Sequence, residues 1–194
     1  MQIASHNSWT FAPVKQWYLR PLAFMARCQR INIKEQLEQG VRSFDLRVRY
    51  NKDVFIMAHG IFKYNYTLLQ LHDDLQTISQ YSRTTQENVS IRVIHEVRNK
   101  SQYTEDSKFY FGELCFNLEY GYPSITFYGG NNLYNGEKDY QFKDDFSIEG
   151  KYSSVCPPKI DDLYPYLYAR LNNHSNIQKG TTKDLLMIDF VDIK

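Results

Sequence analysis

Short apolar runs, many of them rich in β-branched residues, alternate along this chain with segments whose apolar residues recur at helical spacing. The runs at 2–5, 41–50 and 88–97 predict strands. The segments at 29–39 and 66–81 carry Ile and Leu every three or four residues, which predicts helices between those strands. Because strands that alternate with helices form βαβ units, this order predicts an α/β fold with a mostly parallel sheet.

The same alternation continues through the second half of the chain. The length of 194 residues suits one domain, which we predict to span residues 1–194. Further strands are predicted at 54–60, 124–130, 140–148 and 184–193, and further helices at 104–118 and 160–172.

Composition excludes several classes of protein. A formal charge of +1 argues against a general nucleic-acid binder, because such proteins are usually basic. The three cysteines are widely spaced, which fits neither a disulfide framework nor a zinc site. The sequence has no signal-peptide pattern and no apolar run of transmembrane length, which predicts a cytoplasmic protein or one exported by another route.

Titratable side chains recur on or just after the predicted strands. In a parallel sheet the carboxyl ends of the strands meet at one edge, and α/β proteins carry their sites there. A set of unrelated polar residues would not favour these positions so consistently, so we predict that they form one site. The residues are His6, Asp45, Arg47, His59, Glu96 and Asp189.

The stretches IASHNS, QGVRSFDLRVRY and AHG follow one another within residues 2–100. Together they resemble the catalytic X domain of the phosphatidylinositol-specific phospholipase C family, and FKDDF and MIDF add thinner matches. The resemblance implies a distorted (β/α) TIM barrel of the phospholipase C type. Such barrels usually need about 250 residues, so we expect a reduced barrel with shortened or missing helices. The implied reaction cleaves a phosphatidylinositol-type lipid into diacylglycerol and a cyclic inositol phosphate.

The resemblance also implies a role for each strand-end residue. His6 would be the general base and His59 the general acid, since histidine transfers protons near neutral pH. Arg47 would bind the phosphate, because its planar guanidinium matches phosphoryl oxygens. Asp189 would orient His6, and Asp45 would contact His6 or a substrate hydroxyl.

In relatives of the eukaryotic type, a calcium ion lies in the active site, at the position that corresponds to Arg47 here. Asn7, Asp45 and Glu96 match three of those calcium ligands. Arg47 stands where the fourth ligand would be, and a guanidinium repels a metal cation. We therefore expect no metal or other cofactor, with calcium as the alternative. Without a metal, Glu96 would accept a substrate hydroxyl or pair with Arg47.

The resemblance implies a phospholipid or inositol phosphodiester as the partner, with Asp144 and Phe146 contacting the inositol ring. The aromatic segment Trp9–Phe24 either touches a membrane surface or packs on the barrel mouth. Two alternative functions stay open. One is a related phosphodiesterase acting on a glycerophosphodiester or a glycan-anchored lipid. The other is a non-catalytic barrel serving as a binding or assembly module.

Overall fold

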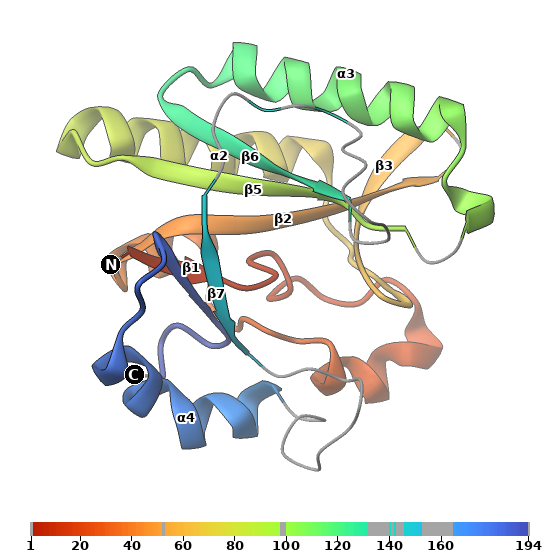
Figure 1. Cartoon of the computed structure of the whole chain (residues 1–194). Coiled ribbons are helices and arrows are strands. Elements are labelled where there is room, and N and C mark those ends of the chain that lie inside the picture. The colour runs from red at the N-terminus through yellow and green to blue at the C-terminus, as the bar shows by residue number, and fades with distance from the viewer. Residues whose placement is uncertain are drawn as a thin grey trace.

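A central sheet of six parallel strands organises the molecule (Figure 1). A computed structural model describes residues 2–51, 53–97, 100–131, 140, 142, 146–152 and 165–193. Within this part of the chain the parallel strands lie in the order β6–β5–β2–β1–β8–β7. They are β1 Gln2–Ser5, β2 Val41–Asn51, β5 Val89–His95, β6 Ile125–Asn131, β7 Ile148–Lys151 and β8 Leu185–Ile188.

Two further strands extend the sheet next to β2. β3 Val54–His59 pairs antiparallel with the last residues of β2, and β4 Phe62–Lys63 pairs antiparallel with β3. This hairpin carries His59 back toward the end of the parallel strands. The parallel register has the same effect for the other strands, since Ser5 lies opposite Ile188 and Val48 lies opposite His95. The residues that follow these strands therefore meet at one end of the sheet.

Helices cover the sheet from two sides (Figure 1). α2 Leu68–Thr85 and α3 Glu105–Gly121 lie over β5 and β6, whereas α4 Pro165–Lys179 and the 3₁₀ helix η1 Trp17–Met25 lie on the side of β1 and β7. Capping boxes fix where three of the helices begin, because a cap side chain and the third helical residue satisfy each other's backbone N–H groups. The caps are Asn32, Thr67 and Thr104. The remaining helices are α1 Ile33–Glu38 and η2 Lys100–Gln102.

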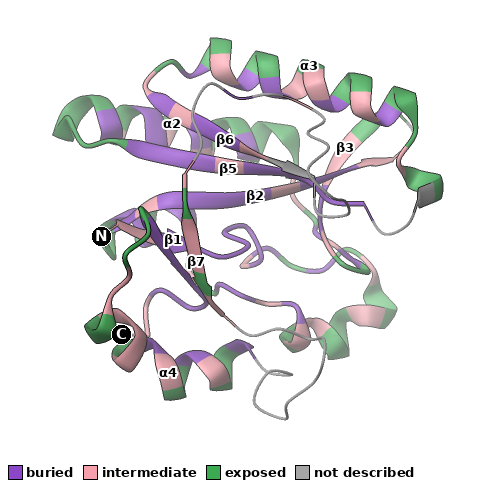
Figure 2. Cartoon of the chain, viewed as in Figure 1, coloured by how far each residue is buried: buried purple, intermediate pink, exposed green. Residues whose placement is uncertain are grey.

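The two faces of the sheet bury different apolar clusters. β2 and β5 are mostly buried, whereas β3 and β7 are largely half-buried (Figure 2). The outer face packs Phe44 and Ile91 against helix residues such as Ile78 and Phe111. The concave inner face holds a smaller cluster of Ala4, Tyr128, Leu185 and Met187. Side chains alternate between the two faces along each strand. The inner face therefore passes from apolar residues to Asp45, Arg47 and His6 toward the carboxyl ends.

The structure confirms the α/β class and most of the predicted elements. The helix predicted at 29–39 begins only at Ile33, because Asn32 is its cap. The last strand ends at Ile188, before Phe190 takes a positive φ of 46°. η1 was not predicted, since its Trp and Tyr residues follow no helical period. Most of the strand predicted at 140–148 falls outside the described residues, and β7 begins at Ile148.

The sheet curls toward a barrel. Tyr128 on β6 contacts the ring of Phe146, just before β7, with the ring centres 4.8 Å apart. Between described residues no backbone ladder joins β6 to β7. In the described residues the sheet has eight strands, of which β3 and β4 are antiparallel, whereas all eight strands of a complete (β/α) barrel are parallel.

Candidate active site

A histidine–aspartate pair lies where β1 and β8 end. His6 Nδ1 is 2.8 Å from Asp189 Oδ1, and both side chains are buried. Asn7 Nδ2 and Arg47 Nη2 each lie 3.1 Å from His6 Nε2. Because both of these groups are donors, we assign the ring proton to Nδ1, where it is donated to Asp189. His6 Nε2 then carries no proton and acts as an acceptor, which is the state that a general base requires.

The turn after β1 explains why a serine follows His6 and Asn7. Asn7 takes a positive φ of 46°, which asparagine tolerates better than most residues. Ser8 Oγ donates to the Ser5 carbonyl at 2.9 Å and accepts from the Asp45 backbone N–H at 2.7 Å. Ser8 N–H also donates to the Asp45 carbonyl. These bonds tie the turn that carries His6 to the middle of β2.

Arg47 links the acidic residues of the site to His6. Its Nε donates to Asp45 Oδ2 at 2.9 Å, and its Nη1 is 3.7 Å from Glu96 Oε2. Burial by itself lowers the pKa of Arg47, but the charges of Asp45 and Glu96 outweigh it and raise that pKa above its usual value. Burial likewise opposes ionisation of Asp45, yet the charges of Arg47 and Arg92 lower its pKa to about 2. Both groups are therefore charged at neutral pH.

His59 faces His6 across the site. The two ring centres are 6.1 Å apart with the planes nearly perpendicular, and His59 Nδ1 lies 3.1 Å from the Ala26 carbonyl. With the ring proton on Nδ1, His59 donates a hydrogen bond to that carbonyl, and Nε2 is the nitrogen that gains or loses a proton. Desolvation, followed by the positive charge of Arg47, lowers the pKa of His59 to about 3. Two rings at this separation can contact the two sides of one bound phosphodiester.

Glu96, Arg49 and Gly60 form a hydrogen-bonded group that we call the clamp. The Gly60 N–H donates to Glu96 Oε1 at 2.8 Å. Arg49 donates from Nε to the Glu96 carbonyl at 3.1 Å and from Nη2 to the Gly60 carbonyl at 2.6 Å. Gly60 directly follows His59 and has a φ of 56°, a backbone conformation that glycine adopts without strain. The clamp therefore fixes the turn that presents His59.

The donors predicted for calcium do not fit that ion in this geometry. Calcium needs six or more oxygen ligands around one point. The Arg47 guanidinium stands between the Asp45 and Glu96 carboxylates. Asn7 turns its amide nitrogen toward His6 and Cys28. A cation held by these side chains would lie against the guanidinium charge, so in this arrangement they do not form a calcium site.

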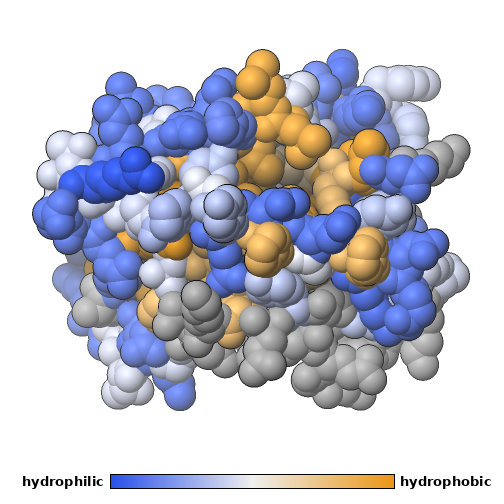
Figure 3. Space-filling model, turned by 90° about the horizontal axis from the view of Figure 1, so that it is seen from above, coloured by the Kyte–Doolittle hydropathy of each residue, from blue (hydrophilic) through white to orange (hydrophobic). Residues whose placement is uncertain are grey.

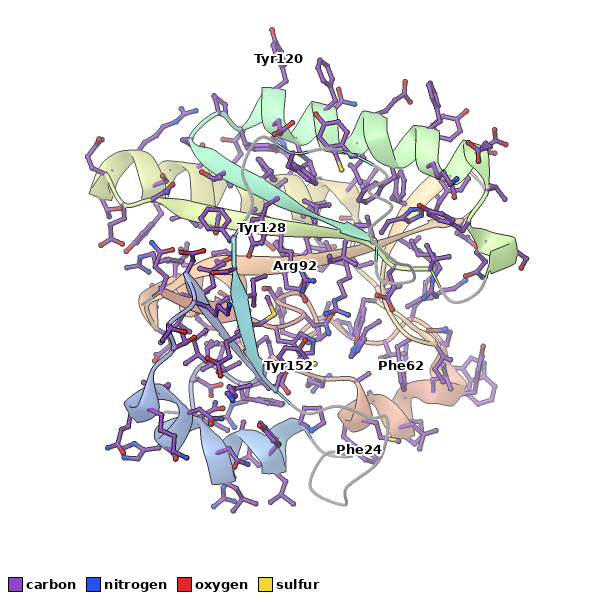
Figure 4. The ribbon with its side chains drawn as sticks, in the orientation of Figure 1. Phe24, Phe62, Arg92, Tyr120, Tyr128 and Tyr152 are labelled. Atoms are coloured by element: carbon purple, nitrogen blue, oxygen red, sulfur yellow. The ribbon has the colours of Figure 1, made fainter. Side chains whose placement is uncertain are left out.

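Two residues near His6 were not anticipated from the sequence. Tyr152 follows β7 (Figure 4), and its ring stacks on the His6 ring with the centres 3.8 Å apart. Gly150 leaves room for it, because a Cβ there would lie 2.5 Å from the Tyr152 ring. Cys28 is buried below the site, with Sγ 3.7 Å from Asn7 Nδ2. An aromatic at a strand end was the only signal for Tyr152, and no local pattern indicated Cys28.

The remaining predicted residues lie elsewhere. Phe146 packs edge-to-face on Tyr128 beside the inner cluster, and Asp144 falls outside the described residues. For the segment Trp9–Phe24, the alternatives were packing against the protein and exposure toward a membrane, and its aromatic residues show both environments. Trp9 is buried and donates to Asp74 at 2.8 Å, whereas Trp17 is 76% exposed. The segment therefore packs at its start and presents aromatic side chains to solvent along η1.

Comparison with protein families gave one match. The model described as phosphatidylinositol-specific phospholipase C, X domain, matches residues 7–116, which is more than half of the chain. The matched range contains His6's neighbour Asn7, together with Asp45, Arg47, His59 and Glu96. A search of curated proteins found no match.

Solved structures similar to this chain include two bacterial enzymes and a mutant of one of them. Phosphatidylinositol-specific phospholipase C from Listeria monocytogenes is similar with a TM-score of 0.64 and 16% identity, over 98% of this chain and 88% of that one. A Staphylococcus aureus phosphatidylinositol-specific phospholipase C, from work on its membrane binding, has a TM-score of 0.59 and 14% identity, over 97% of this chain and 85% of that one. A single-site mutant of the S. aureus enzyme has a TM-score of 0.61 and 16% identity, over 97% of this chain and 84% of that one.

Proposed function

Because the chain belongs to the phosphatidylinositol-specific phospholipase C X-domain family, whose members cleave phosphodiester bonds, we propose that His6 and His59 perform this cleavage by general acid–base catalysis. The observation that carries the proposal is the His6–Asp189 pair, which leaves His6 Nε2 as an acceptor beside the Arg47 guanidinium. We propose a phosphatidylinositol-type lipid as the substrate and the whole chain, residues 1–194, as one catalytic domain.

The reaction follows from the roles of the two rings. The inositol hydroxyl next to the phosphate first displaces Asn7 and Arg47, which now donate hydrogen bonds to His6 Nε2. His6 Nε2 then takes the proton of that hydroxyl. The hydroxyl oxygen attacks phosphorus, and the bond from phosphorus to the glycerol oxygen breaks. His59 donates its proton to that oxygen, which releases diacylglycerol and leaves a cyclic inositol phosphate. Arg47 holds the charge of the phosphoryl oxygens, and Asp189 stabilises the protonated His6.

Two buried carboxylate oxygens support recognition of a polyhydroxylated head group. Asp45 Oδ1 and Glu96 Oε2 accept no hydrogen bond from the described residues. Buried acceptors of this kind favour a ligand that brings hydroxyl donors. In this proposal Tyr152, which already stacks flat on His6, provides an aromatic face for the inositol ring. The predicted contacts of Asp144 and Phe146 belong to the same proposal.

We propose that η1 touches the lipid surface. Trp17, Tyr18, Leu22 and Phe24 are exposed on it, and the relative from S. aureus was studied for its membrane binding. Aromatic side chains favour the interface between lipid and water. In the described part of the chain, no helix is both long and apolar enough to cross a bilayer. Contact through η1 would be peripheral.

The test compares wild type with His6→Ala on phosphatidylinositol vesicles and on a soluble inositol phosphodiester. The expected loss in kcat for His6→Ala is about 10²–10⁴-fold. His72→Ala is the matched control, because His72 lies on α2 and hydrogen-bonds Tyr122. EDTA should leave the activity unchanged, since Arg47 takes the place of a metal. A cyclic inositol phosphate should appear as the product.

A substrate panel separates the alternatives. Turnover of a glycerophosphodiester or a glycan-anchored lipid, without turnover of phosphatidylinositol, would change the substrate but keep the two-histidine chemistry. No turnover of any phosphodiester by wild type would leave a non-catalytic barrel. Activity that EDTA abolishes would overturn the metal-free part.

A further inference from the structure

The sulfur of Cys28 lies next to the His6–Asp189 pair. The Cys28 thiol, a His6 ring nitrogen and an Asp189 carboxylate oxygen all lie within 4.8 Å of one another. The three side chains are almost completely buried, with exposed fractions of 1%, 4% and 0%. The proposed mechanism uses His6 and Asp189 but gives Cys28 no task. A thiol this close to a catalytic histidine therefore needs its own explanation.

Sulfur, imidazole nitrogen and carboxylate oxygen are the ligands that bind Zn²⁺ in proteins. Ligands about 2.0–2.3 Å from a tetrahedral ion lie roughly 3.5 Å from one another, so side-chain shifts of about 1 Å would close the present triangle. We propose that Cys28, His6 and Asp189 form an inhibitory site for a thiophilic divalent cation, Zn²⁺ or Cd²⁺. The inhibition rests on the proposed function, whereas the binding does not.

Binding would disable His6 through its tautomer. The ion takes the position of the Nδ1 proton between His6 and Asp189, and that proton moves to Nε2. The Asn7 amide and the Arg47 guanidinium, which now donate to Nε2, must then turn away from it. The thiol proton of Cys28 leaves to solvent as the sulfur binds the metal as thiolate. With a proton on Nε2, His6 can no longer accept one from the substrate hydroxyl. Removal of the ion by a chelator returns both protons and restores the base.

The donor set also predicts selectivity and rate. Ca²⁺ and Mg²⁺ prefer all-oxygen ligands, so neither should bind to a thiolate and an imidazole. Tyr152 covers one face of His6, and the cluster has almost no exposed surface. An ion can reach the three ligands only after these side chains move. Inhibition should therefore develop slowly after mixing instead of appearing at once.

The binding test uses Cd²⁺, because a cadmium–thiolate bond gives an ultraviolet charge-transfer band. Titration of metal-free wild-type protein should give the band at one ion per chain, and Cys28→Ala should lose it. Cys28→Ser, which keeps a hydrogen-bonding side chain of similar size but no thiol, should also lose it and guards against misfolding of the alanine variant. Cys115→Ala is the matched control, because Cys115 is buried on α3, and it should keep the band.

The activity test uses Zn²⁺, with each variant normalised to its own activity in EDTA. Wild type should be inhibited in a time-dependent way and recover in EDTA, and Cys28→Ser should need at least tenfold more Zn²⁺ for the same inhibition. A band that survives in Cys28→Ser, or equal inhibition of both proteins, would overturn the proposed site. If no phosphodiester is cleaved, the Cd²⁺ titration still decides whether the site exists.

Discussion

The surroundings of His59 set a pH dependence for the reaction. Burial and the Arg47 charge lower its pKa to about 3, so the ring of the free protein is neutral at pH 7. A general acid must carry its proton, and its protonated fraction falls about tenfold for each pH unit above the pKa. A bound phosphodiester anion would oppose the effect of Arg47, but only once the substrate is in place.

We therefore predict that kcat/KM, which reports the protonation states of the free enzyme, reaches its maximum below pH 7. With a soluble inositol phosphodiester it should be higher at pH 5 than at pH 8, and His59→Ala should lose this decline along with most activity. Circular dichroism at each pH checks that the fold persists. A kcat/KM that rises steadily from pH 5 to pH 8 would mean that His59 is not the acid.

At the scale of elements, the clamp explains how the short β3–β4 hairpin presents His59. Arg49 comes from β2, Glu96 follows β5, and Gly60 belongs to the turn between β3 and β4. Each group alone is an ordinary buried contact. Together they join three parts of the sheet at the residue after His59, so we expect Arg49 to act as a positioning residue.

Arg49→Lys keeps the buried charge but removes the planar pair of donors. We predict that kcat falls at least tenfold while KM for a soluble substrate changes less than threefold, because His59 shifts and the binding groups stay. Arg42→Lys is the control, since Arg42 forms its ion pair with Glu87 on the surface. An unchanged kcat in Arg49→Lys, with the pH profile of wild type, would show that the clamp is only structural.

A second prediction concerns η1. Replacing Trp17 and Tyr18 with alanine should weaken binding to phosphatidylinositol vesicles several-fold in a sedimentation assay and leave turnover of a soluble substrate intact. The control is Phe116→Ala. Phe116 is 60% exposed on α3, the outer layer over β5 and β6. The face of the molecule seen in Figure 3 carries apolar side chains among polar ones. Equal losses on vesicles and on soluble substrate would place η1 in the active site instead.

At the scale of the whole molecule, the inner cluster holds the curled sheet together. Met187 on β8 is fully buried among Ala4, Leu185 and Tyr128, and Tyr128 hydrogen-bonds Ser43 on β2 at 2.8 Å. This cluster joins β1, β6 and β8 on the inner face of the sheet. Its packing substitutes for a backbone ladder between β6 and β7 in the described residues.

Met187→Ala should lower the free energy of unfolding by about 2–5 kcal/mol, the usual cost of a cavity left by a large buried side chain. Urea denaturation followed by circular dichroism measures it. Leu171→Ala, at a position 64% exposed on α4, should change stability by less than about 0.5 kcal/mol. A Met187→Ala loss no larger than that of Leu171→Ala would show that the inner cluster carries little of the stability.

Local patterns in the sequence determined what depends on near neighbours. β-branched runs produced the strands, and the capping residues Asn32, Thr67 and Thr104 set where helices begin. The strand-end positions of His6, Arg47 and His59 followed, because a parallel sheet aligns its carboxyl ends whatever the loops do. The boundary errors, at Ile33 and Ile188, come from a cap and from a residue with positive φ.

Only the tertiary structure decided which groups meet beyond that alignment. Glu96 accepts from the backbone of Gly60 and stands beside Arg47, Tyr152 stacks on His6, and Cys28 lies beneath it. These contacts join residues far apart in the chain. They depend on the paths of loops and on how strongly the sheet curls. The spacing of apolar residues along the sequence predicts neither of these. The sequence thus placed the candidate residues at the strand ends, and packing decided the contacts that they make with Tyr152, Cys28 and Gly60.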